Sequence, residues 1–91
     1  MHESVLEQIQ KLVLSGDVYF TSHAEEEMVE DNLTVYDVES VILSGLITRR
    51  QRDEFDYKYV IVGETTAADE ATVVCKLRNE IVIITVFMGT L

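Results

Sequence analysis

Apolar residues in the first half of the chain recur every three or four positions, as on one face of an amphipathic helix. Two segments show this spacing, at about 5–15 and about 35–44. A shorter and mostly acidic segment at about 23–31 carries Ala24 and Met28 four positions apart. We therefore predict three helices before position 45.

The expected ends of these helices support the same division. Each helix starts with a hydroxyl residue and an acid three positions later, and the pairs are Ser4 with Glu7, Ser22 with Glu25, and Thr34 with Asp37. Such pairs form capping boxes, in which the two side chains satisfy backbone N–H groups that lack a partner inside the helix. Left-handed residues are expected to end the helices at Gly16, Asn32 and Gly45.

After position 45 the apolar spacing changes to two, which is typical of strands. The predicted strands are Leu46–Gln51, Tyr57–Gly63, Thr72–Arg78 and Ile81–Met88. The last is apolar on both faces, which predicts a central or covered strand. The chain is therefore expected to be a single α+β domain over residues 1–91, with two to three N-terminal helices packed on one face of a four-stranded antiparallel sheet.

A two-residue turn at Asn79 and Glu80 would fix the pairing of the last two strands. It places Leu77 opposite Val82, Cys75 opposite Ile84, and Val73 opposite Val86. These six side chains would face the core, because side chains of one strand alternate between the faces of a sheet. The same register leaves Ile81, Ile83 and Phe87 on the open face, where a partner could bind.

Composition restricts where such a domain works. The longest apolar run, Ile81 to Met88, is interrupted only by Thr85 and is far shorter than the ~20 residues of a membrane-spanning helix. The first residues lack the basic start and apolar centre of a signal peptide. A single cysteine, Cys75, cannot form an internal disulfide, so we expect a reducing cytoplasm and a thiol packed in the core.

Charge is distributed unevenly along the chain. There are 17 acidic residues and 7 lysines and arginines, and the formal net charge is −10. Residues 1–45 hold ten acids and one base, whereas residues 46–91 hold seven acids and six bases. A protein with this balance repels phosphate backbones unless a local basic patch overcomes the field. Any contact with RNA would therefore involve the second half.

The bases of the second half form the main candidate for catalytic chemistry. They are Arg49, Arg50, Arg52, Lys58, Lys76 and Arg78, with Tyr57 and Tyr59 among them. Arginine stabilises phosphate charge, and tyrosine or lysine can transfer protons and stack on bases, as in metal-independent RNA-cleaving folds. The structural alternative is a sheet edge that carries charges to prevent aggregation.

His23 is the candidate general base or substrate contact. It falls in the first helical turn, where the helix dipole favours a neutral imidazole. The structural alternative is a half-buried histidine that is hydrogen-bonded to a neighbouring strand. His23 and Glu27 are spaced as two metal ligands, but the chain offers no set to complete a tetrahedral site, so neither a metal nor a cofactor is predicted.

Several segments together resemble a known family, the domain of unknown function 4258. They are Phe20-Thr21-Ser22-His23-Ala24, Met28, Leu33-Thr34-x-x-Asp37-Val38, Val41-x-x-x-Gly45, Tyr59-Val60-Ile61-Val62-Gly63 and Ile83-Ile84-Thr85-Val86-Phe87. The resemblance covers about residues 19–88 and implies a relationship to the RelE-like toxin fold, whose members include small ribonucleases neutralised by an antitoxin. Family members usually carry arginines in the helix after Ser-His-Ala, where this chain has Glu27 and Glu30 or Asp31.

Two functional hypotheses follow. In the first, the protein is the ribonuclease toxin of a toxin–antitoxin pair or its inactive descendant, with catalytic residues His23, Tyr59, Lys76 and Arg78 and RNA-binding residues Arg49, Arg50, Arg52 and Lys58. In the second, it is a non-catalytic interaction module. The strand Ile81–Met88, with Ile81, Ile83 and Phe87 on its open face, and the acidic helices would bind a partner or a second copy. Helix acidity favours the second hypothesis, and the resemblance favours the first.

Overall fold

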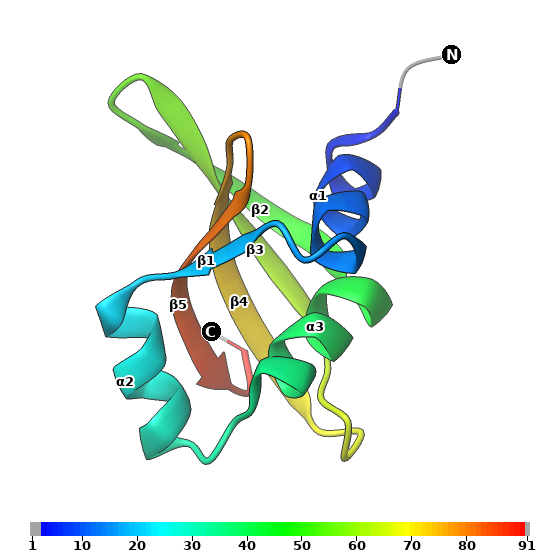
Figure 1. Ribbon diagram of the computed structural model, residues 1–91, viewed down its shortest axis with the longest axis vertical. Helices are drawn as coiled ribbons and strands as arrows, with labels where there is room; N and C mark the ends of the chain where they lie inside the picture. The colour runs from blue at the N-terminus through cyan, green and yellow to red at the C-terminus, as the bar shows by residue number, and fades with distance from the viewer. Residues whose placement is uncertain (1–2, 91) are drawn as a thin grey trace.

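The computed structural model describes residues 3–90 and shows helices packed against a mixed sheet (Figure 1). The elements in chain order are α1 (Val5–Leu14), β1 (Val18–Phe20), α2 (Ser22–Glu30), α3 (Val35–Ser44), β2 (Leu46–Asp53), β3 (Asp56–Glu64), β4 (Glu70–Leu77) and β5 (Ile81–Met88). The α+β class and the three predicted helices are confirmed. No helix within residues 3–90 is long and apolar enough to cross a membrane.

Two of the three helices begin at the N-cap residue that the sequence predicted. Ser4 and Thr34 form the expected capping boxes with Glu7 and Asp37. The start of α2 is shifted by one residue, because the Thr21 side chain, not that of Ser22, accepts the hydrogen bond from the Ala24 N–H. Thr21 has the extended backbone that an N-cap residue requires, whereas Ser22 is already the first residue of the helix.

Left-handed residues end α1 and α2 as predicted, at Gly16 (φ 81°) and Asn32 (φ 54°). The prediction for Gly45 is wrong, because its backbone is extended. A Cβ at Gly45 would lie 2.5 Å from the carbonyl oxygens of both Val41 and Val62, and Gly63 is equally crowded. These two glycines are therefore required by the close approach of α3 to β3, and not by a turn.

The sheet has five strands within residues 3–90, in the order β1-β5-β4-β3-β2, and not the four antiparallel strands that the sequence predicted. The additional strand, β1, is only three residues long and pairs parallel with β5, with Val18 opposite Ile81 and Phe20 opposite Ile83. A three-residue strand has no periodicity of its own and exists here through that distant pairing. Over Ile81–Ile83, β5 lies between β1 and β4, as predicted for a central strand.

The β4–β5 register differs from the prediction at the turn. Leu77 pairs with Ile81 across a three-residue connection, and a bulge then inserts Ile84, so that Val73 still pairs with Val86. The predicted pairs of Leu77 with Val82 and of Cys75 with Ile84 are therefore wrong. Between the turn and the bulge every side chain of β5 points to the face opposite the predicted one.

The shift moves two predicted partner-binding residues into the core. Ile81 and Ile83 are fully buried, and the expectation that they lie on the open face is wrong. Phe87, beyond the bulge, stays half-buried on that face, where it pairs with Thr72. Cys75 is buried as predicted, and desolvation raises the pKa of its thiol to about 12.

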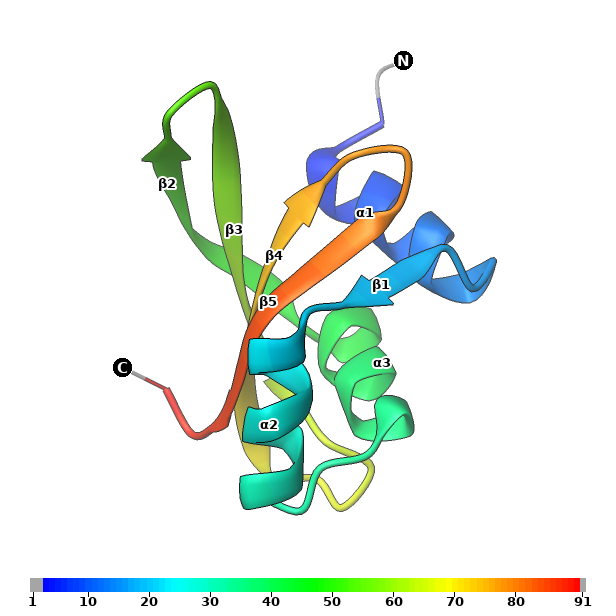
Figure 2. The same ribbon diagram turned by 60° about the vertical axis from the view of Figure 1, so that its left-hand side comes forward.

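The core lies between the sheet and all three helices, and α2 contributes Ala24 and Met28 to it while packing along β5 (Figure 2). Asp37, which is 9% exposed, links α3 to the loop between β3 and β4. One of its carboxylate oxygens accepts hydrogen bonds from the Thr66 hydroxyl (2.6 Å) and N–H (3.0 Å), and the other accepts two from Thr34. These bonds, that of the Thr66 hydroxyl first, lower the Asp37 pKa from 3.8 to about 2. Because the three helices pack on the core side of the sheet, the opposite face is left open.

Candidate functional site on the open face of the sheet

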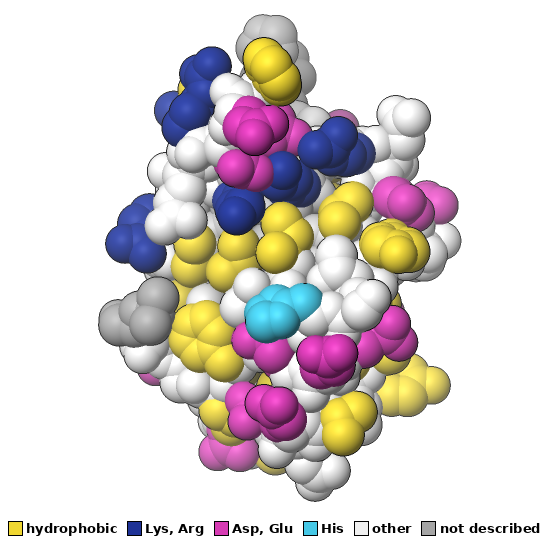
Figure 3. All heavy atoms as spheres, turned by 90° about the vertical axis from the view of Figure 1, so that its left-hand side faces the viewer, with side chains coloured by type: hydrophobic (Ala, Val, Ile, Leu, Met, Phe, Trp, Pro, Cys, Tyr) yellow, Lys and Arg dark blue, Asp and Glu magenta, His cyan; other side chains and the backbone are white. Residues whose placement is uncertain are grey.

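No helix of residues 3–90 packs on the face of the sheet opposite the core. Strand pairing places its side chains in three rows: Leu46–Val62–Thr72–Phe87, Arg49–Val60–Val74–Thr85, and Lys76–Val82–Tyr19. Most members are apolar. Tyr19 and Leu46 are 54% and 69% exposed, whereas Val60 and Thr72 are buried and the other apolar members are half-buried. We call this surface the open face. Figure 3 shows it as a band of hydrophobic side chains, with acidic groups below it and basic groups with carboxylates among them above it.

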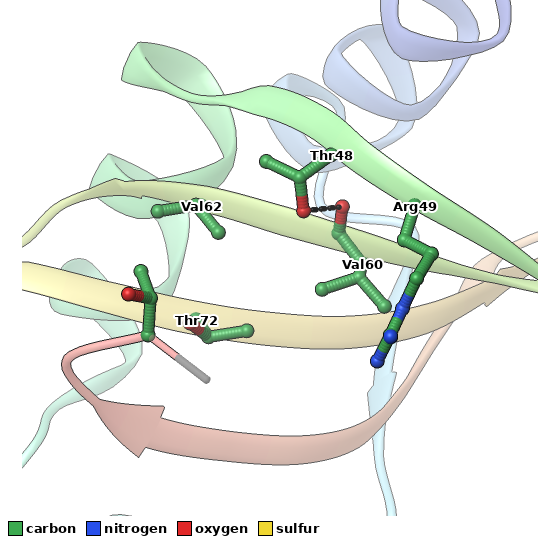
Figure 4. Close-up of a pocket in the computed structure, with 6 residues that line it drawn as sticks. Thr48, Arg49, Val60, Val62 and Thr72 are labelled. Carbon is green, nitrogen blue, oxygen red and sulfur yellow. Dashed lines mark hydrogen bonds between the residues drawn. The ribbon is translucent and has the colours of Figure 1, made fainter.

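A hollow of about 350 Å³ lies within the open face at β2 and β3 (Figure 4). Its lining consists of Thr48, Arg49, Val60, Val62, Thr72 and Thr90. The Thr48 and Thr72 hydroxyls donate to the carbonyl oxygens of Val60 (3.4 Å) and Gly89 (2.7 Å), so both donors are used internally. Arg49 is the charged residue of the lining, and the hollow can accept an apolar group beside an anionic one.

Two of the predicted catalytic bases form an ion-pair cluster at the hairpin end of the open face. The Lys76 Nζ lies 2.5 Å from Asp53 and 3.3 Å from Asp56, and the Arg78 guanidinium lies 2.7 Å from Asp56. The hydrogen bond between Lys76 and Asp53 is the main cause that raises the lysine pKa and lowers the aspartate pKa. Lys76 is therefore held protonated and is neutralised by neighbouring carboxylates.

The arginines and tyrosines of the β2–β3 hairpin divide between the two faces of the sheet. Arg50 lies over the Tyr57 ring, with its Cζ 4.4 Å from the centroid, and Arg52 lies at 5.5 Å from the same centroid. Tyr59 pairs with Cys75 and packs against the core, so it lies on the helix side of the sheet. Arg49 and Lys58, which pair with Val60 and Gln51, lie on the open face. The predicted cluster is thus separated by the sheet itself.

His23 lies at the other border of the open face, at the start of α2. Its Nε2 is 3.3 Å from the Glu27 carboxylate, and the same carboxylate oxygen accepts a hydrogen bond from the Val86 N–H at 3.1 Å. Asp31 accepts from the Met88 N–H at 3.2 Å. Within residues 3–90 no hydrogen bond or ion pair joins His23 to Tyr59 or the basic cluster. The predicted catalytic residues are not assembled into one constellation.

The acidic residues of α2 therefore have a structural role that the sequence did not reveal. Beyond Ile83, no strand of residues 3–90 pairs with the outer side of β5, and Glu27 and Asp31 satisfy two of its backbone donors. Such coverage protects a sheet edge that would otherwise pair with another chain. In the sequence, the four-residue spacing of Glu27 and Asp31 places both carboxylates on one side of the helix. Only the pairing of β1 with β5 shows that this side covers the edge of β5.

The described residues offer no preformed metal centre, because within residues 3–90 no three histidine, cysteine, aspartate or glutamate side chains converge on one point. The fold and its open face define a small α+β domain with a five-stranded sheet covered on one side. A protein-family model described as domain of unknown function (DUF4258) matches residues 20–88, and the chain belongs to this family. No curated protein and no solved structure matches the chain.

Proposed function

We propose that this domain is a protein-interaction module and that the open face is its binding surface. The observation that carries the proposal is the three rows of mainly apolar side chains that no helix of residues 3–90 covers. Contiguous exposed apolar surface is uncommon on soluble monomers and marks sites of association. The hollow beside Arg49 adds a charged contact at one border of this surface.

The placement of the polar groups supports binding over catalysis. Lys76 and Arg78 already have carboxylate partners, and a phosphate would have to compete with Asp53 and Asp56 for them. Tyr59 lies on the other side of the sheet. A general acid or base must come within hydrogen-bond reach of the reacting atom, which these groups cannot do together without rearrangement.

Site-specific photo-crosslinking in living cells tests the proposal with a matched pair of tyrosines. Tyr19, on the open face, is 54% exposed, and Tyr36, on α3, is 73% exposed. Replacing each in turn with a photoreactive phenylalanine should give a discrete crosslinked product from position 19 and none of that size from position 36. Equal products from both positions, or none from position 19, would contradict the proposal.

The ribonuclease activity that the family resemblance suggests is a second proposal, favoured by the position of Arg49 and Lys58 on the same open face. In that case an antitoxin would occupy the face and block RNA. Induction of the protein in bacteria should then arrest growth and degrade mRNA, and Arg49→Ala should relieve both effects. Normal growth with intact mRNA would remove this candidate.

A further inference from the structure

We infer that the partner on the open face is a second copy of this chain, related to the first by a two-fold axis that lies in the plane of the contact, parallel to the strands. This inference rests on the proposed function and names its partner. It depends on how charge is arranged around the apolar rows, because a surface that is basic at one border and acidic at the opposite border is complementary to itself.

The basic border is formed by β2, the last strand on one side of the sheet. Arg49 points from β2 across the hollow, next to Val60, and within residues 3–90 it has no ion pair or side-chain hydrogen bond. Lys58 lies on the same face. Lys58 acts electrostatically on Asp53, so Arg49 is the cationic group of this border that no ion pair within residues 3–90 neutralises.

The acidic border is formed by α2, which runs beside β5 on the other side of the sheet. Glu27 and Asp31 are committed to the β5 backbone. Glu30 is seven positions after His23 and so lies on the same side of α2, next to Glu27 and Asp31. Figure 3 shows the histidine where the apolar band meets the acidic side chains of α2. Glu30 is exposed and is the carboxylate available to a partner there.

A two-fold axis through the middle of the open face exchanges these borders. The rows of apolar side chains of the two open faces then pack against each other, and Arg49 of each copy approaches Glu30 of the other. A uniformly basic partner would meet the same acidic border but would be repelled by Arg49 and Lys58. A uniformly acidic partner would be repelled by α2.

The net charge of −10 does not prevent this association at physiological ionic strength. At about 0.15 M salt the Debye length is about 8 Å, and the smallest dimension of the molecule is 25 Å. Acids of α1, on the far side of the helical layer, are therefore screened from the partner copy. Charges at the contact itself are screened much less, so the two Arg49–Glu30 contacts persist.

Sedimentation velocity at this salt concentration tests the arrangement through charge reversal. The wild-type chain should sediment as a dimer at micromolar concentration, and Arg49→Glu or Glu30→Arg should each weaken the dimer at least about tenfold, because each places like charges together twice. The combined variant Arg49→Glu/Glu30→Arg should regain most of the affinity. Arg50→Glu and Glu25→Arg, which change charge away from the open face, should leave the dimer unchanged.

Circular dichroism confirms that each variant is folded before the comparison. A wild-type chain that stays monomeric up to about millimolar concentration, where even the weakest specific contacts associate, would overturn the second-copy inference. The inference would also be overturned if neither single charge reversal weakened the dimer. It would be overturned as well if the combined variant had no higher dimer affinity than the single variants. A strict monomer whose position 19 still crosslinks to another protein would leave the proposed function standing without the second copy.

Discussion

Replacing Asp37 by asparagine should destabilise the fold by an amount that depends on pH. The carboxylate accepts four hydrogen bonds, two on each oxygen, from Thr34 and Thr66. An asparagine side chain has about the same volume as aspartate. However, its NH₂ group replaces one carboxylate oxygen and would face the donors of either Thr34 or Thr66, where an acceptor is needed. The substitution therefore removes the stabilisation of the charged carboxylate and leaves backbone donors unsatisfied.

The magnitude follows from the lowered pKa. A shift from 3.8 to about 2 corresponds to about 2.4 kcal/mol of stability while the carboxylate is ionised in both folded and unfolded chains. Because the folded pKa is the lower one, this stability is present above pH ~4 and is lost as the pH falls toward 2. About half of it should remain at pH 3.

Urea denaturation of wild type and Asp37→Asn at pH 7, 4, 3 and 2 measures the difference directly. We expect the part of the difference that comes from the charge to be about 2 kcal/mol at pH 7 and 4, about half of that at pH 3, and little at pH 2. The donors that the amide leaves unsatisfied add a part that is the same at every pH. Asp69→Asn, an exposed acid of the same loop, is the control and should show a difference below about 0.5 kcal/mol. A difference between wild type and Asp37→Asn that does not change with pH would refute the reasoning.

Four further substitutions test the packing and the assignment of faces. Gly63→Ala places a Cβ inside the van der Waals contact distance of the Val41 carbonyl oxygen and should cost more than about 3 kcal/mol by urea denaturation. Gly16→Ala, which meets open space, should cost only the ~1–2 kcal/mol of a left-handed backbone. Ile83→Glu should prevent folding as seen by circular dichroism, whereas Val82→Glu, which faces Lys76 on the open face, should fold normally. If Ile83→Glu folded as well as Val82→Glu, the assigned register would be wrong.

Features set by neighbouring residues could be predicted from the sequence. The capping boxes at Ser4 and Thr34 and the left-handed Gly16 and Asn32 depend on contacts within about five residues, and the structure has them as expected. Gly45 was misinterpreted because its requirement comes from β3 across the core. A glycine needed for close approach looks the same in a sequence as a glycine needed for a turn.

The candidate site was harder to predict because it depends on which face of the sheet each side chain occupies. The connection between β4 and β5 is one residue longer than predicted, and a bulge inserts Ile84. Together these place Ile81 and Ile83 in the core and Val82 on the open face. The bases are close together in the sequence, but alternation along β2 and β3 separates Arg49 from Arg50. Register follows from the whole sheet, so residue types alone could not assign the open face.

The central claim is that the open face is where this protein binds its partner. The most direct measurement is the crosslinked product from position 19 in cells, compared between the wild-type background and Val82→Glu. Val82 pairs with Tyr19 across the β1–β5 boundary, and a carboxylate there adds charge to the apolar band. We predict that the product disappears while the protein stays folded and abundant. An undiminished product from the folded Val82→Glu protein would contradict the account.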